Sequence, residues 1–284
     1  MMAQWIDSHC HLDAPEFSAD RSEVLKRAQE VGVQWCVMPA VQAKDFAALQ
    51  DMAKSFVQPY ALGIHPLFVP QAQAEDLLHL EDCIQKALSV SDAGNITDPR
   101  LVAVGEIGLD FFVPNLCEPE MRKKQLFFYH AQLKLAEKYK LPVILHVRKS
   151  QDQILKRLRQ TKVSGGIAHA FNGSFVQAQQ FLDLNFKLGF GGTLTFERAL
   201  QIRRLACDLP LDAFVLETDE PDIPPAWLKE EGESRNEPAN LPRIAQEFVK
   251  LRNLEEEFVS QQALQNALAV LPRWQSLIQA NPIA

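Results

Sequence analysis

The chain has 284 residues, of which 47% are hydrophobic and 23% are charged, and this ordinary globular composition excludes a fibrous protein and long disordered regions. Its 29 basic and 36 acidic residues give a formal net charge of −7, which disfavours a protein that coats nucleic acid through bulk charge but allows a local phosphate or metal site. Since one α/β barrel commonly fills about 250 residues, a single domain over residues 1–284 is expected.

Eight short apolar runs, rich in β-branched residues, predict strands that are buried on both faces. They cover residues 4–7, 35–41, 60–65, 101–106, 142–146, 166–169, 186–189 and 214–217. Segments with apolar residues three or four positions apart lie between these runs and predict helices. They cover residues 19–31, 44–56, 74–91, 118–139, 150–160, 174–184 and 196–207.

The repeated alternation of strands and helices predicts a closed parallel (β/α)8 barrel of the TIM type. One to three extra helices are expected after the last strand, near residues 241–251 and 255–271 and in a short tail. An open doubly wound sheet is the alternative, and the absence of a GxGxxG motif at the first helix disfavours its dinucleotide-binding form. The proline-rich segment 220–242 predicts a long loop over the barrel mouth, where function concentrates.

Residue types that ligate metals stand where the predicted strands end. They are His9, His11, His65, Glu106, His146, His169 and Asp219. Since the carboxyl ends of barrel strands converge on one face, we expect these side chains to meet. His9 and His11 are two residues apart, which places both on one side of an extended backbone, while Cys10 points away and is excluded as a ligand.

An HxH pair alone is typical of chance or of a surface pair. Its combination with acids and further imidazoles at separate strand ends favours a metal site. The alternative, that these are polar side chains buried in the core, would require a separate hydrogen-bond partner for each of them. Imidazole together with carboxylate suits zinc, manganese, iron or nickel.

Seven motifs, in this order, resemble the TatD family of deoxyribonucleases within the metal-dependent amidohydrolase superfamily. They are IDSHCHLD (6–13), GIHP (63–66), GEIGLD (105–110), PVILHVR (142–148), HAFNG (169–173), ETDEP (217–221) and RNEP (235–238). The resemblance, which extends to about residue 271, implies a metal-dependent hydrolase. Its expected activity is that of a DNase and 3′–5′ exonuclease, cleaving phosphodiester bonds at single-stranded or frayed DNA ends with a metal-activated water. DNA is thus the expected partner, and no obligate protein partner is evident.

The resemblance also implies a site for two divalent cations. His9, His11 and Asp219 would hold one ion, His146 and His169 the other, and Glu106 would bridge both. Where related amidohydrolases carry a carbamylated lysine this chain has a glutamate, so no carbamate is expected. The metal stays open among zinc, manganese, magnesium and nickel, because histidines favour the transition metals whereas the family is described as magnesium-activated.

Asp219 is expected to act as catalytic base as well as ligand, with Glu106 and Arg148 completing the catalytic set. Arg148 follows His146 by two residues and could hold a phosphate with two parallel hydrogen bonds, the alternative being a salt bridge at the start of the next helix. His65 is interpreted as a phosphate donor or a support for a ligand. Asn172, beside a predicted helix start, and Arg235 are interpreted as substrate-binding, the alternatives being a helix cap and an anchored loop.

Three acids near the strand ends have supporting interpretations. Asp7 orients a ligand or packs at the strand end, Asp110 supports a ligand or forms a turn, and Glu217 supports a ligand from deeper in the barrel. Glu220 stands where the family commonly has serine, and we expect this change to alter the pocket wall.

Aromatic residues also lie near the strand ends. Phe111, Phe112 and Phe171 could stack on bases, and core packing is the more frequent alternative. A second function class stays open, in which the same metals hydrolyse an amide, a lactone or an aminoacyl-tRNA ester. A third, an inactive scaffold, is disfavoured because all six implied metal ligands are present.

The five cysteines are widely spaced without a CxxC motif, which is typical of reduced thiols. The chain reaches Asp7 before an apolar signal core could form, and no apolar run approaches the roughly 18 residues of a membrane helix. We therefore expect a cytoplasmic protein without a membrane segment.

Overall fold

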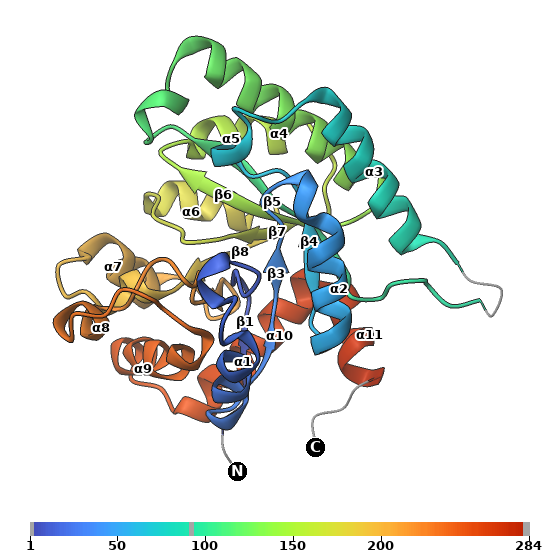
Figure 1. The fold of residues 1–284 in the computed structure, drawn as a ribbon. Helices are drawn as coiled ribbons and strands as arrows, with labels where there is room; N and C mark the ends of the chain where they lie inside the picture. Colours follow the sequence, from blue (N-terminus) through green and yellow to red (C-terminus); the bar gives the residue numbers. More distant parts are fainter. Residues whose placement is uncertain (1–2, 91–93, 281–284) are drawn as a thin grey trace.

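The structure is a computed structural model that describes residues 3–90 and 94–280, and Figure 1 shows its strands in the middle of the molecule with helices around them. The strands are β1 (Trp5–Asp7), β2 (Val33–Cys36), β3 (Met38–Pro39), β4 (Tyr60–Leu62), β5 (Leu101–Asp110), β6 (Val143–Arg148), β7 (Gly166–Ala168), β8 (Phe186–Phe190) and β9 (Phe214–Leu216).

The helices follow the strands along the chain as predicted. They are α1 (Arg21–Glu30), α2 (Phe46–Phe56), α3 (Ala74–Leu88), α4 (Pro119–Tyr139), α5 (Gln151–Leu158), α6 (Phe175–Leu182), α7 (Leu200–Asp208), α8 (Ala226–Glu230), α9 (Leu241–Arg252), α10 (Glu256–Val270) and α11 (Pro272–Ala280). The short helix α8 lies inside the segment that the sequence predicted to be a loop, and Ser91, the last residue of the predicted third helix, lies outside the described residues.

The strands close into a barrel. Strands β3 to β9 form one parallel ladder in chain order, β1 pairs with β2, and Val37 alone separates β2 from β3. The backbone N–H of Ser8, after β1, donates to the carbonyl oxygen of Leu216 in β9 at 3.0 Å and so links the first strand to the last. Because β2 and β3 together occupy one strand position, the circuit is the closed parallel (β/α)8 TIM barrel that the alternation predicted.

Strand β5 is longer than predicted and carries Glu106 within it. The apolar run stops at this charge, but the strand continues to Asp110, with a shift of register against β6 between Val104 and Ile107. Such a bulge redirects side chains, so Glu106 can face the barrel mouth from inside a strand whose every residue is buried. This bulge cannot be predicted from the alternation of apolar and polar residues along the sequence.

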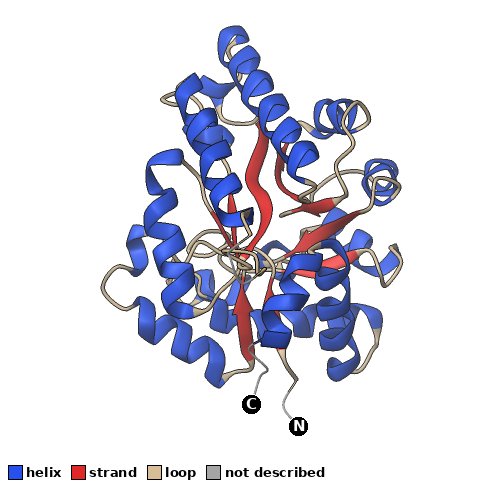
Figure 2. Ribbon diagram, turned by 90° about the vertical axis from the view of Figure 1, so that its right-hand side faces the viewer, coloured by secondary structure: helices blue, strands red, loops and turns tan. Residues whose placement is uncertain are grey.

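The extra helices α10 and α11 close the amino-terminal end of the barrel. Leu271 and Trp274 are fully buried against barrel residues such as Ile6 and Ile144, and Arg273 donates to the carbonyl oxygen of Leu101 at the start of β5. Figure 2 shows both chain ends on this side of the molecule. The carboxyl ends of the strands at the opposite side are left for a functional site.

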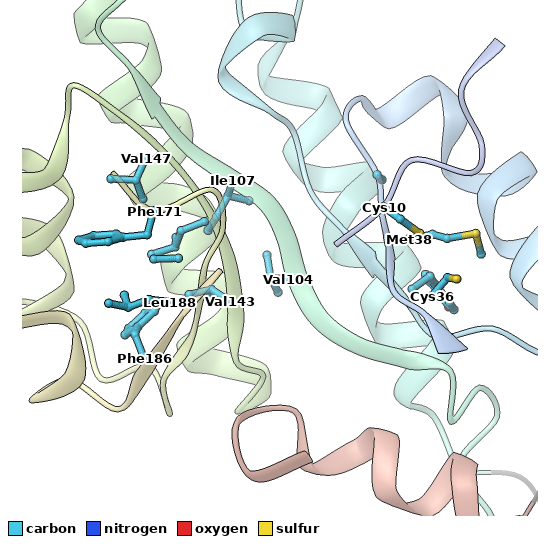
Figure 3. Packing of buried hydrophobic residues seen from close by; sticks show 14 of the residues in the cluster. Cys10, Cys36, Met38, Val104, Ile107, Val143, Val147, Phe171, Phe186 and Leu188 are labelled. Atoms are coloured by element: carbon cyan, nitrogen blue, oxygen red, sulfur yellow. The ribbon is translucent and has the colours of Figure 1, made fainter. Parts of the chain in front are cut away.

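A second, larger core fills the space between the strands and the outer helices, and Figure 3 shows part of it. Phe171, which is 1% exposed, contacts the Phe181 ring edge-on with ring centroids 5.4 Å apart. Core packing, the alternative to base stacking, is therefore correct for Phe171. Cys10 is buried in the same core near Cys36, in agreement with its exclusion as a ligand.

Candidate metal centre

Glu106 lies at the centre of the residues that the strand ends bring together. Its Oε2 atom is 3.2 Å from His9 Nε2 and 3.5 Å from His11 Nε2. Its Oε1 atom is 2.8 Å from His169 Nε2 and 3.1 Å from His146 Nδ1. The two oxygens of one carboxylate, which is 1% exposed, thus face different imidazoles.

Asp219 completes the cluster from the end of β9. Its Oδ1 atom is 3.3 Å from His9 Nε2, 3.7 Å from His11 Nε2 and 3.8 Å from His169 Nδ1. Its backbone adopts a left-handed φ of 58°, and its N–H donates to the carbonyl oxygen of His9. The structure therefore places Asp219 beside the HxH pair, as its implied role requires.

The donor set fits divalent cations. His9 Nε2 and His11 Nε2 are 3.3 Å apart, and His169 Nε2 and His146 Nδ1 are 3.4 Å apart. A neutral imidazole has one N–H and one lone pair, so these nitrogens and the carboxylates direct lone pairs at the same small volumes. Among the described residues, the buried Nδ1 atoms of His9 and His169 also have no hydrogen-bond partner. Cations would satisfy the lone pairs that face Glu106, and these two Nδ1 atoms would then carry the ring hydrogens.

Three groups of ligand atoms at this site are close enough to hold an ion. They are His9, His11 and Glu106; His9, His169 and Asp219; and His65, Glu106 and His146. Glu106 is common to two of the groups.

The charges of the cluster are shifted by burial and by one another. Burial alone would raise the pKa of Glu106, but the charges of His169, His65 and His9 outweigh it and hold that pKa well below its usual range. Burial alone would lower the pKa of His146, but its hydrogen bonds with Asp110 and Glu106 raise it to about 9. Since a metal ligates the neutral imidazole, ion binding must release such protons.

Asp110 orients His146 and also forms a turn, so both interpretations from the sequence describe it. Its Oδ1 accepts from the backbone N–H groups of Phe112 and Val113, and its Oδ2 is 3.1 Å from His146 Nε2. Because an ionised carboxylate can only accept, the Nε2 of His146 carries the hydrogen, and Nδ1 is left to face Glu106.

His65 is held as a hydrogen-bond donor. Its Nδ1 accepts from the backbone N–H of Leu67 at 3.1 Å, so a neutral ring carries its proton on Nε2. That Nε2 is 3.3 Å from Glu106 Oε1. Burial lowers the pKa of His65 to about 4, which keeps the ring neutral near pH 7. In this tautomer His65 presents an N–H to Glu106 and no lone pair, so it supports a ligand-type residue in this structure, and its role as a phosphate donor stays a prediction.

Buried acids lie behind the cluster. Asp7 accepts from the backbone N–H groups of His9 and Thr218, and the Thr218 hydroxyl is 2.5 Å from both Asp7 Oδ2 and Glu220 Oε2. One hydroxyl donates one proton, so a carboxyl group of this pair must itself be protonated. Burial accordingly raises the pKa of Asp7 to about 7 and that of Glu220 well above its usual range.

The expectation that Glu220 alters the pocket wall is wrong. Its side chain is fully buried against Thr218, behind the cluster, and its backbone oxygen accepts from the N–H of His11 at 3.0 Å. Glu220 therefore positions a ligand-type residue, which the sequence did not indicate because a charged residue after a strand is usually exposed.

Glu217 supports the site from deeper in the barrel, as expected. Its Oε1 accepts from the N–H of Ala170 and lies 3.9 Å from His169 Nδ1. A Cβ added at Gly189 would lie 2.2 Å from Glu217 Oε2, so this position in β8 has no room for a side chain. Burial raises the pKa of Glu217 to about 8.

The structure does not bring three of the expected substrate-binding residues into the cluster. Arg148 is half exposed at the rim, with Nη1 3.8 Å from Asp110 Oδ2. Asn172 is exposed after β7, and the neighbouring Ser174 caps α6. Arg235 forms two 2.8 Å hydrogen bonds with Asp20, at the start of α1, as the anchored-loop alternative requires.

Two buried glutamines on α4 were missed. Gln125 accepts from the N–H of Asp110, and Gln132 accepts from the N–H of Ile64 and donates to its carbonyl oxygen. They fix the ends of β5 and β4, where Asp110 and His65 lie. Their seven-residue spacing on the apolar face of a helix was the available signal.

No helix in the parts of the chain that the structure describes is both long enough and apolar enough to span a membrane.

Comparisons with known proteins identify relatives of this chain. A family model described as TatD related DNase matches residues 6–272. An uncharacterized metal-dependent hydrolase of Haemophilus influenzae is 36% identical over 273 residues, covering 94% of this chain and 98% of that protein. Deoxyribonuclease TATDN3 of Homo sapiens is 30% identical over 277 residues, covering 96% of this chain and 97% of that protein.

Among solved structures, the crystal structure of YjjV, a TatD homologue from Escherichia coli K12, superposes with a TM-score of 0.86 at 34% identity, covering 96% of this chain and 99% of that one. The family match spans nearly the whole chain and includes the carboxyl end of every strand described above. The chain belongs to the TatD family of metal-dependent hydrolases.

Proposed function

We propose that this chain is a deoxyribonuclease, a 3′–5′ exonuclease that cleaves phosphodiester bonds at single-stranded or frayed DNA ends, in the cytoplasm and as a single catalytic domain. The observation that carries the proposal is the Glu106 carboxylate, whose two oxygens face different imidazoles at the barrel mouth. The name of the matching family and that of the human relative support DNA as the substrate.

Two divalent cations, of zinc, manganese, magnesium or nickel, are part of the proposal. His9, His11 and Asp219 would hold one and His146 and His169 the other, with Glu106 shared between them. When bound, such cations lower the pKa of a water molecule towards neutrality and offset the negative charge that a phosphodiester gains during displacement.

The chain's own residues supply the proton transfer and the binding of phosphate. Burial alone would raise the pKa of Asp219, but the charge of His169 and the hydrogen bond from His9 outweigh it and lower that pKa. Asp219 is therefore ionised near pH 7 and can accept the proton of the attacking water. The Nε2–H of His65 and the guanidinium of Arg148 are donors for phosphate oxygens on the same side of the barrel.

Asn172 and Arg235 remain proposals as substrate-binding residues. The exposed side chain of Asn172 could contact a DNA strand at the rim, whereas Arg235 would have to break its hydrogen bonds with Asp20 to bind substrate. Hydrolysis of an amide, a lactone or an aminoacyl-tRNA ester is the second candidate. The net charge of −7 favours its amide and lactone substrates, because small neutral molecules need no basic surface, but not aminoacyl-tRNA, which is a polyanion.

One assay separates these candidates. Metal-stripped protein is given magnesium, manganese, zinc or nickel in turn, with end-labelled single-stranded DNA beside aminoacyl-tRNA and a panel of lactones. We expect stepwise release of nucleotides from the 3′ end, and its loss in Asp219→Asn. If the protein hydrolyses an ester but releases no nucleotides with any of the four metals, the proposed nuclease activity is wrong.

A further inference from the structure

One aromatic ring and two cations form a cluster at the rim of the barrel, beside the candidate metal centre. The Arg148 guanidinium carbon lies 4.0 Å from the centroid of the Phe112 ring, and the Lys149 ammonium lies 5.0 Å from it. Both cations are exposed, and 48% of Phe112 is exposed as well. Here this group of three residues is called the rim cluster.

Local backbone geometry brings two consecutive side chains to the same ring. Neighbouring residues in a strand point to opposite faces. Arg148 is the last residue of β6, and Lys149 follows it with a left-handed φ of 52°. The turn at Lys149 breaks the alternation of side chains between the two faces of the strand. Both cations therefore reach Phe112, at the point where the chain leaves the barrel.

The rim cluster is continuous with the metal centre through Asp110. Asp110 Oδ2 is 3.1 Å from His146 Nε2 and 3.8 Å from Arg148 Nη1, and Asp110 Oδ1 accepts from the backbone N–H of Phe112. One buried carboxylate thus fixes an imidazole of the cluster, a cation of the rim and the backbone of the exposed ring. A substrate bound at the metal centre would reach the rim cluster by extending along β6.

The three phenylalanines at the strand ends differ in what they can contact. Phe171 is buried, and Phe111 is partly buried beneath the guanidinium of Arg122, 4.4 Å from its centroid. Phe112 has a large exposed surface, although burial of a phenylalanine would stabilise the fold. An exposed ring flanked by two cations is suited to a ligand that is both flat and anionic.

We propose that the rim cluster binds one nucleotide of single-stranded DNA, its base stacked on Phe112 and its flanking phosphates paired with Arg148 and Lys149. This inference rests on the proposed phosphodiesterase activity of the adjacent centre. Aromatic rings stack on unpaired bases of any sequence, and nearby cations follow the phosphates. In a duplex the bases are already stacked, so the cluster selects single-stranded or frayed ends. A local site of this kind also explains how a chain of net charge −7 can hold a polyanion.

The test uses the metal-loaded full chain and single-stranded oligonucleotides in which one abasic residue is moved stepwise from the 3′ end. For the wild type we expect KM to rise about 10-fold when the base is missing at one position, because a stacked base contributes on that scale. In Phe112→Ala the KM of the intact strand should rise by a similar factor, and the dependence on that position should disappear. Phe112→Trp should keep it, since the larger ring still stacks.

Matched variants distinguish this role from a general effect on the fold. Phe258→Ala removes a ring of similar exposure, 43%, on α10 at the closed end of the barrel, and Lys156→Ala removes an exposed cation from the last turn of α5. Both should keep the wild-type dependence on the abasic position. Lys149→Ala should instead weaken binding and reduce the dependence of KM on salt.

The possible outcomes are distinct. If the wild type cleaves DNA but its KM is the same for every abasic position, or if Phe112→Ala keeps the wild-type dependence, the rim cluster does not bind a base. If Phe112→Ala does not fold, Phe112→Leu replaces it, since leucine keeps an apolar side chain without a ring. Its KM is then compared with the wild-type KM at each abasic position, and a Phe112→Leu variant that keeps the wild-type dependence excludes base binding. If the wild type cleaves no DNA under any metal, the proposed function fails, and this inference fails with it.

Discussion

Replacing Glu106 by glutamine should remove most of the metal affinity of this chain. Glutamine keeps the shape of the side chain but removes its negative charge. The charge lies at a residue that is 1% exposed, and both carboxylate oxygens are directed at imidazole nitrogens, at distances from 2.8 to 3.5 Å. Because the pKa of Glu106 is held well below its usual range, the wild-type side chain is fully ionised at neutral pH.

The magnitude follows from the position of this charge. Two opposite unit charges about 4 Å apart attract each other by about 4 kcal/mol at an effective dielectric constant near 20, the value that suits sites in proteins. A cation held by the same imidazoles lies within that range of the carboxylate. Each ion carries two charges, so loss of the carboxylate charge should weaken its binding by at least about 1,000-fold, since about 1.4 kcal/mol corresponds to a factor of ten.

Calorimetric titration of metal-stripped protein with zinc or manganese, followed by elemental analysis after dialysis, measures the effect. Glu217→Gln is the matched control, because Glu217 is equally buried but its pKa is raised to about 8, so the wild-type side chain is mostly neutral at pH 7. We expect the control to keep its ions. Glu106→Gln protein that retained as many ions as the wild type, or a control that lost as many, would refute the assignment of Glu106 as the shared ligand.

Three further changes have expected outcomes. Asp110→Asn removes the carboxylate that orients His146 and should weaken metal binding by about 10- to 100-fold, measured by the same titration. Arg148→Ala should lower kcat/KM for DNA by about 10- to 100-fold while the metal content is unchanged, since a charge-assisted hydrogen bond contributes about 1.5–3 kcal/mol. Burial raises the pKa of Glu217 from 4.5 to about 8, so the stability that this group contributes is present below about pH 4.5 and is lost as the pH rises through about 8. Glu217→Gln should therefore raise the melting temperature of metal-stripped protein near pH 9 and change it less near pH 5. The difference in the free energy of unfolding is roughly 1.4 kcal/mol for each unit of the pKa shift. Equal effects at both pH values would show that the carboxyl group is not buried in its neutral form.

The sequence predicted the barrel and the gathering of ligand-type residues because both depend on short-range patterns. Each motif joins an apolar strand to the side chain at its end, as in the segment that ends at His146, and the barrel topology then brings the ends to one face. The bulge that places Glu106 inside β5 depends instead on the register between two strands, which no local pattern records.

Residues that act through long-range contacts were not predicted for the same reason. The carboxyl group of Glu220 shares the Thr218 hydroxyl with Asp7, which lies 211 residues before Thr218, and Gln125 reaches the backbone of Asp110 from another element. Arg235 lies in a motif of the family, yet the structure pairs it with Asp20, 215 residues earlier in the chain. A motif shows that a residue type is needed at a position, but the partner that explains the need is visible in three dimensions alone.

Depth also separates the acids of this site by charge. Glu106 and Asp219 face the imidazoles, which lower their pKa values, whereas burial raises the pKa values of Asp7, Glu217 and Glu220 behind them. Asp110, which contacts His146, is also charged, since its pKa is lowered to about 2. Three charged carboxylates, neutral imidazoles and two divalent cations would sum to −3 + 4 = +1, which attracts a phosphodiester. With all six acids ionised the sum would be −6 + 4 = −2, and the same ions would leave a site that repels its substrate. The neutral acids therefore accept hydrogen bonds from the backbone N–H groups of His9 and Ala170 without adding charge, which allows a buried site built from many carboxyl groups to bind an anion.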